Sequence, residues 1–94
     1  MRYETHTHMK RDDIFEAAKT YFGGEEGGLG MKQSAHQGNQ IAFFGNGLIW
    51  VTVWPGKPGD PVRVDVDVSD RDADAKDFIR KVLQAPVAAS KLDH

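Results

Sequence analysis

The stretch LIWVTVWP, Leu48 to Pro55, constrains the fold more than any other segment of this sequence. Side chains of a β-strand alternate between the two faces of a sheet, so Ile49, Val51 and Val53 share one face. The opposite face carries the other side chains of the strand: Leu48, Trp50, Thr52 and Trp54. Both faces are therefore apolar, and the two tryptophans lie together on the face opposite the β-branched residues.

The segments around this strand carry the turns of an antiparallel β-meander. Gln37-Gly38-Asn39 and Gly45-Asn46-Gly47 are tight-turn sequences. Val62 to Val68 alternates valines with charged residues, which predicts a strand with one dry face and one wet face. The predicted strands are 29–36, 40–44, 48–54 and 62–68, with a further candidate at 2–8.

Two amphipathic helices flank these strands. The first is expected to begin near Asp13, which can form a capping box with Glu16, and to end at Gly23. The second is expected to begin with Ser69 or Asp70 as its cap, because acidic residues follow in its first turn. Its apolar stripe consists of Ala75, Phe78, Ile79, Val82 and Leu83.

Both helices must bury their apolar stripes against one sheet face, which leaves the other face open. The sequence therefore predicts an α+β two-layer sandwich, a four- or five-stranded antiparallel meander sheet with two helices on one face. The order is α-β4-α or β-α-β4-α, in a single domain over 1–86 with a loose tail over 87–94. The β-α-β4-α order resembles half of a TATA-box-binding protein, whose open sheet face binds DNA, and the sandwich is broadly similar to frataxins. The resemblance concerns topology alone and implies no functional residue in this chain.

Charge and composition argue against several classes of function. Twelve Lys and Arg against fourteen Asp and Glu give a formal charge of −2, and the basic residues are scattered, so no polyanion-binding patch is predicted. The chain has no cysteine, which excludes disulfides and a Cys-based zinc site. It shows neither an apolar signal core nor the roughly 18 apolar residues of a membrane span. We expect a soluble, cytoplasmic protein without a cofactor or a membrane partner.

The two tryptophans are the main candidates for a binding surface, because aromatic side chains dominate interfaces and ligand grooves. Three interpretations are open: core residues covered by the tail or by loops, self-association through the sheet, and a groove for a ligand or partner. The predicted interface residues are Leu48, Trp50, Trp54, Arg63, Asp65 and Asp67. The leading hypothesis is a small interaction module that forms a homodimer through this face.

Other partners are possible for the same face. Single-stranded nucleic acid could stack its bases on Trp50, Trp54 and Phe43, but Asp65 and Asp67 would repel phosphates. A small ligand or a different protein is the remaining alternative. The two aspartates could also mimic a catalytic carboxylate pair, but Arg63 in the same row favours ordinary solvated charge. No catalytic residue is predicted, and the chain is more readily explained as a non-enzyme.

The histidines suggest one further alternative, a metal-dependent site. His6 and His8 would lie on one face of a strand, with His36 as a third ligand. Imidazole suits zinc or another borderline metal. The spacing of the three is not diagnostic, so no metal site is predicted from it.

Overall fold

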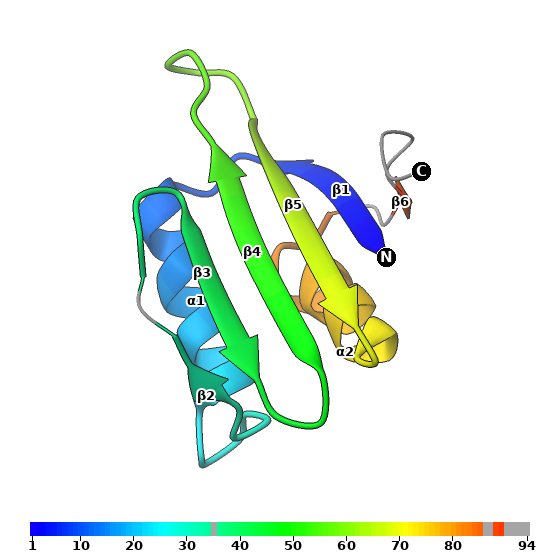
Figure 1. The fold of residues 1–94 in the computed structure, drawn as a ribbon. Helices are drawn as coiled ribbons and strands as arrows, with labels where there is room; N and C mark the ends of the chain where they lie inside the picture. The colour runs from blue at the N-terminus through cyan, green and yellow to red at the C-terminus, as the bar shows by residue number, and fades with distance from the viewer. Residues whose placement is uncertain (35, 86–87, 90–94) are drawn as a thin grey trace.

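The computed structural model describes residues 1–34, 36–85 and 88–89. Within them, six strands form one antiparallel sheet in the order β2-β3-β4-β5-β1-β6. The strands are β1 (Arg2–Thr7), β2 (Lys32–Gln33), β3 (Gln40–Phe44), β4 (Leu48–Trp54), β5 (Val62–Ser69) and β6 (Ala88–Ala89). The helices are α1 (Arg11–Gly23) and α2 (Asp72–Asp77), which continues into a π-helical segment, η1 (Phe78–Val82). Both helices lie on the same side of the sheet, so the predicted α+β sandwich is confirmed (Figure 1).

The central strands follow the sequence pattern closely. β3 and β4 have the predicted bounds, and β5 extends one residue further, to Ser69. In the turn between β3 and β4, Gly45 and Gly47 have φ of 152° and 139°, which glycine adopts without strain. The candidate strand at 2–8 is also present: β1 pairs antiparallel with β5 along its whole length. This pairing places the N-terminal strand next to the last long one, so β5 has a neighbour on both sides.

The predicted strand over 29–36 is wrong in length, because only Lys32–Gln33 pair as a strand with β3. The backbone N–H groups of Leu29 and Met31 instead donate to carbonyls near the end of α1, at 3.0 and 2.8 Å. Gly30 between them has φ of 66°. These hydrogen bonds hold residues 29–31 against the end of α1, so the strand starts only at Lys32.

The predicted cap of the first helix is wrong. α1 begins at Arg11, and its N-cap, Lys10, makes no capping hydrogen bond with its side chain. Asp13 therefore lies inside the first turn, where its carboxylate still interacts favourably with the helix dipole.

The predicted cap of the second helix is also wrong. Ser69 belongs to β5, and Asp70 has φ of 62° in the turn that follows. Arg71 occupies the N-cap position without a side-chain cap bond. Its guanidinium instead binds the carbonyl of Gly45, with Nη2 at 2.6 Å, which ties the start of α2 to the β3–β4 turn.

The hydrophobic core lies between the helices and the covered face of the sheet. Ile49, Val51 and Val53 of β4 are fully buried there. The other large buried side chains of this core include Phe15, Phe22, Phe43, Phe78, Ile14, Ile41 and Ile79. The apolar stripe predicted for the second helix thus packs on the sheet as expected.

Tyr3 connects β1 to the start of α2 on the covered face. Its ring is buried, and its hydroxyl donates a hydrogen bond to Asp72 Oδ2 at 2.7 Å. Burial, together with this bond and the charge of Asp72, raises the pKa of Tyr3 to about 12. The phenol is therefore neutral at physiological pH.

Two further findings concern the end of the chain and the membrane. Ala88–Ala89, within the segment predicted as a tail, pair with β1 as β6, whereas residues 90–94 lie outside the described part.

No helix in the described residues is long and apolar enough to cross a membrane.

Candidate functional site on the open face of the sheet

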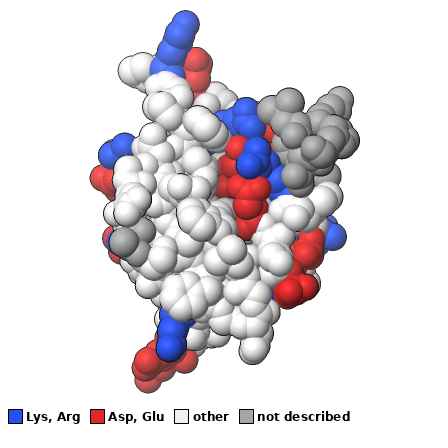
Figure 2. All heavy atoms as spheres, viewed as in Figure 1, with Lys and Arg blue, Asp and Glu red and all other residues white. Residues whose placement is uncertain are grey.

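The face of the sheet opposite the helices divides into two halves. β3 and β4 carry an apolar band made of Phe44, Leu48, Trp50 and Trp54, which are 43, 36, 38 and 47% exposed. β5 and β1 carry a charged cluster made of Arg2, Glu4, Arg63, Asp65 and Asp67. Figure 2 shows these charges gathered over β5 and β1, beside an uncharged expanse over β3 and β4.

The structure places both tryptophans on this open face, as the alternation along β4 predicts. Neither is buried in the core between the sheet and the helices. The alternative in which the tail covers them falls largely on 86–87 and 90–94, which lie outside the described residues. Leu48 lies in the same row, and its cross-strand neighbour is Phe44. Leu48 and Trp50 of β4 therefore lie beside Phe44 of β3, and Trp54 lies further along the same row, beyond Thr52.

The charged cluster is paired within the chain. Arg63 donates to both carboxylate oxygens of Asp65, from Nε at 3.0 Å and from Nη2 at 3.1 Å. The same Nη2 lies 3.7 Å from Glu4 Oε1, and Arg2 Nε donates to Asp67 Oδ1 at 2.7 Å. The hydrogen bond to Asp65 is the largest of the effects that raise the pKa of Arg63, so this guanidinium stays charged. The cluster therefore neutralises most of its own charge.

Asp65 differs from the expectation of a solvated residue, because only 2% of its surface is exposed. It lies on a strand with neighbours on both sides, between Thr52 of β4 and Glu4 of β1. Besides the two bonds from Arg63, it accepts a hydrogen bond from Trp54 Nε1, at 2.9 Å from Oδ2. A buried carboxylate is stable when its oxygens are bonded in this way. Asp65 is thus covered by its neighbours and holds the side chains of Trp54 and Arg63 in place.

Trp54 is fixed at one end of the apolar band. Its indole N–H is bound to Asp65, and the guanidinium carbon of Arg63 lies 5.7 Å from its ring centroid. Arginine placed over an indole adds a cation–π attraction. Because the polar atom of Trp54 is already bound, its exposed surface offers purely apolar contact.

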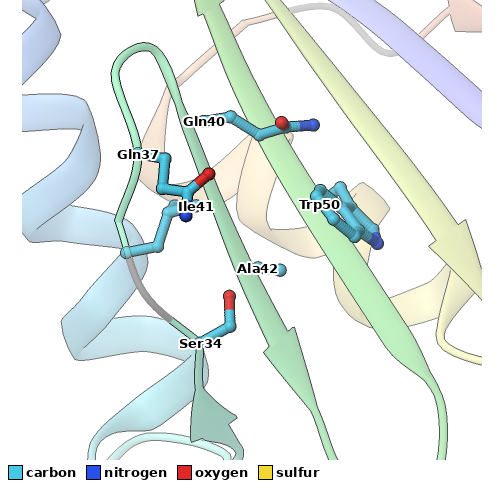
Figure 3. A pocket seen from close by; sticks show the side chains of 6 residues that line it. All are labelled: Ser34, Gln37, Gln40, Ile41, Ala42 and Trp50. Carbon is cyan, nitrogen blue, oxygen red and sulfur yellow. The ribbon is translucent and has the colours of Figure 1, made fainter.

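Trp50 lies between two hollows of the open face. One, of about 180 Å³, is on the β3 side and is lined by Ser34, Gln37, Gln40, Ile41, Ala42 and Trp50 (Figure 3). The other, of about 160 Å³, is on the β5 side and is lined by Met1, Leu48, Trp50, Asp67, Val68 and Ser69. No described residue accepts a hydrogen bond from the indole N–H of Trp50. The two tryptophans therefore differ in how their polar atoms are used.

The sequence reasoning missed several members of this face. Arg2 and Glu4 belong to the charged cluster only because β1 pairs with β5, a pairing that the sequence pattern does not specify. Phe44 could have been found from the alternation along 40–44, which puts it in a different row from Phe43. Phe43, expected as a stacking residue for nucleic acid, is instead fully buried in the core on the other face. The polar residues of the hollow beside Trp50 carry no recognisable signal, because part of that hollow comes from irregular chain.

The three histidines do not come together as a metal site. His6 and His8 are exposed, whereas the ring of His36 lies 4.3 Å from the ring of Phe15, between centroids. Across residues 1–34, 36–85 and 88–89, no group of three or more His, Cys, Asp or Glu side chains could hold a metal ion.

Compared with protein-family models, curated proteins and solved structures, the chain matches none. The open face, with its apolar band and its internally paired charges, is therefore the basis on which a function can be assigned.

Proposed function

We propose that this chain is a small interaction module that forms a homodimer through the open face of its sheet, with Trp50 and Trp54 as anchors. The observation that carries this proposal is the apolar band, in which Phe44, Leu48 and Trp50 are exposed in adjacent positions on two paired strands. Trp54 is exposed on the same face, beyond Thr52. Monomeric proteins seldom expose contiguous apolar patches of more than a few hundred Å², and larger patches mark interaction sites.

A second copy of the chain suits this face because of its charges. A two-fold contact brings the same patch of each copy together. An unpaired charge near the axis would therefore lie opposite an identical charge of the other copy. In the charged cluster, Arg2 and Arg63 are paired with carboxylates of the same chain. Two arginines against three carboxylates leave the charged cluster of each copy a net charge of only −1, so two copies can approach with little repulsion between like charges.

The two anchors are expected to contribute unequally. Interface energy concentrates in a few residues, with tryptophan and arginine enriched among them. Trp54 is held by Asp65 and lies against Arg63, so less side-chain freedom is lost when a partner covers it. Trp50 has no such bond, and we expect it to contribute less.

Single-stranded nucleic acid, the main alternative partner, receives less support from this geometry. Such proteins combine stacking aromatics with cations that are free to contact the phosphate backbone. Arg2 and Arg63, the cations of the charged cluster, already bind carboxylates at 2.7 and 3.0 Å. A phosphate would have to displace one of these bonds.

Sedimentation velocity from low to high micromolar concentration tests the proposal. We expect a dimer at high concentration, a dissociation constant raised about thirtyfold by Trp54→Ala, and a smaller increase for Trp50→Ala. Tryptophan emission should shift to the red on dilution, as the indoles leave the interface. A wild-type chain that is monomeric at high micromolar concentration would contradict the proposal.

Leucines of equal exposure provide a matched control. Leu48 in the apolar band and Leu29 in the connection between α1 and β2 are both 36% exposed. Leu48→Ala should weaken the dimer, whereas Leu29→Ala should leave it unchanged. Equal effects of the two substitutions would show that general surface hydrophobicity, and not this face, drives association.

A further inference from the structure

The hollow on the β3 side of Trp50 has a different chemistry from the apolar band beside it. Ser34 and Gln37 point in from the segment that runs beside β3, and Gln40 extends from β3 toward the strand that carries Trp50 (Figure 3). Ala42, which is 3% exposed and lies opposite Trp50 in the sheet, belongs to its floor. Neutral polar side chains thus surround a small apolar floor with an indole at one side.

The polar side chains of this hollow are not used within the described part of the chain. No hydrogen bond joins the side chain of Ser34, Gln37 or Gln40 to another described residue, and the indole N–H of Trp50 has no acceptor there. Each amide offers donors and an acceptor, and the hydroxyl offers both. The hollow therefore presents several donors and acceptors in a small space.

The lining also restricts the charge and size of a ligand. The described residues that line it include no Lys, Arg, His, Asp or Glu, so a phosphate, a carboxylate or an amine would gain no ion pair with them. An entirely apolar ligand would leave the amides and the hydroxyl without partners, which is unfavourable. The volume of about 180 Å³ is below the roughly 300–1,000 Å³ of pockets for drug-sized ligands, so it admits a single ring.

We infer that this hollow binds one neutral sugar ring of an oligosaccharide. Sugar hydroxyls donate and accept hydrogen bonds at once, which matches amides and a serine hydroxyl. The C–H face of the ring can pack against the indole of Trp50 and the methyl group of Ala42. A site of this size with so few contacts binds weakly, with a dissociation constant of roughly millimolar order.

This inference does not depend on self-association. Trp54, Phe44 and Leu48 do not line the hollow, whereas Trp50 belongs both to it and to the apolar band. Sugar binding is therefore measured at a protein concentration below that at which any dimer forms. A chain that binds sugar but never dimerises would support this inference and contradict the proposed function. A chain that dimerises but binds no sugar would support the proposed function and contradict this inference.

Two-dimensional NMR of the ¹⁵N-labelled chain tests the inference. The probes are neutral hexasaccharides of α-linked glucose, β-linked glucose, mannose and galactose. We expect at least one of them to shift the indole signal of Trp50 in a saturable manner and to leave the signal of Trp54 in place. The double variant Gln37→Ala, Gln40→Ala should raise the dissociation constant about tenfold, because two hydrogen-bonding side chains are lost.

Gln33→Ala is the matched control, because Gln33 is an exposed glutamine of β2 that does not line the hollow. It should not change the dissociation constant. The inference is overturned if none of the hexasaccharides shifts the Trp50 signal, or if the shift occurs at Trp54 alone. It is also overturned if the double variant binds as wild type does, if a galacturonic acid hexamer binds as tightly, or if a proline-rich peptide binds more tightly than every sugar.

Discussion

Trp50 and Trp54 lie four residues apart on the same face of the same strand, yet they meet different surroundings. Trp54 donates its indole N–H to the buried carboxylate of Asp65 at 2.9 Å and lies beside Arg63. Trp50 lies opposite Ala42 of β3, between two hollows, and its N–H has no acceptor among the described residues. One indole is thus held by the fold and offers apolar surface, whereas the other keeps a free donor.

The cause of this difference is the neighbouring strand. In the register of β4 with β5, Trp54 lies opposite Arg63 and Trp50 lies opposite Asp67. Asp67 is bound to Arg2 of β1, whereas Asp65, diagonal to both tryptophans, turns both of its oxygens to Arg63 and one of them to Trp54. Identical side chains on one strand therefore acquire different roles from cross-strand partners.

The largest expected effect comes from removing the carboxylate of Asp65, which binds the indole of Trp54 but not that of Trp50. Asp65→Ala leaves Arg63 without its closest partner and Trp54 without its acceptor, in a position only 2% exposed. Asp65 is buried, but Arg63 is about one-third exposed and keeps Glu4 nearby, so the cost is mainly that of the lost hydrogen bonds. We therefore expect a loss of about 2 kcal/mol in the free energy of unfolding, measured by urea denaturation.

Asp67→Ala is the matched control for that substitution. Asp67 lies in the same row of β5 and also binds an arginine, but the side chains of this pair are about one-third exposed. Pairs of this kind contribute little, so the loss should be less than about 1 kcal/mol. Equal losses for the two variants would mean that Asp65 has no special role in fixing Trp54.

The three central strands, β3, β4 and β5, and the face of the tryptophans could be predicted from the sequence. Alternation along 40–44 and 48–54 is a local pattern, and the glycine turn at 45–47 leaves little freedom in how the two strands pair. The apolar stripes of the helices are equally local. These features need no knowledge of which distant segments meet.

The burial of Asp65 could not be predicted, because it depends on contacts between distant segments. Its oxygens are covered only after β4 and β1 lie on either side of β5, and β1 is more than fifty residues away in the sequence. The hollow beside Trp50 also depends on Ser34 and Gln37, which line it from outside β2 and β3. The cap of the second helix also depends on a distant segment, since Arg71 at this position binds the carbonyl of Gly45 as well as the local Asp74.

Tyr3 extends the comparison to the covered face, where another aromatic group donates to a carboxylate. Its hydroxyl binds Asp72 at 2.7 Å, and we expect Tyr3→Phe to lower the free energy of unfolding by about 1.5 kcal/mol near neutral pH. The folded-state pKa of about 12 lies above the ordinary value of 10.0. The stabilisation is therefore complete below pH 10 and is lost as the pH rises through 12.

Urea denaturation of wild type and Tyr3→Phe across this alkaline range measures that loss, and the two curves should converge as the phenol ionises. Tyr21 is the other tyrosine of the chain, and burial followed by the charges of Asp77 and Asp74 raises its pKa as well. Phenolate absorbance of the native chain should therefore be delayed beyond the ordinary tyrosine range. A full two-tyrosine absorbance change centred on pH 10 would contradict the Tyr3–Asp72 bond.

The smallest expected effect addresses the two indoles directly, through the exchange of their N–H protons with solvent. Both rings are partly exposed, at 38% for Trp50 and 47% for Trp54, so exposure alone predicts slightly faster exchange at Trp54. The bond to Asp65 predicts the opposite order. A net hydrogen bond of about 1 kcal/mol slows opening about fivefold, so the Trp54 signal should exchange more slowly by roughly that factor.

In the Asp65→Ala variant the order of the two exchange rates should follow exposure again, because both indoles then lack an acceptor. If Trp54 exchanges faster than Trp50 in the wild-type chain, the two tryptophans are equivalent in solution, and the apolar band has no fixed end for a partner to bind.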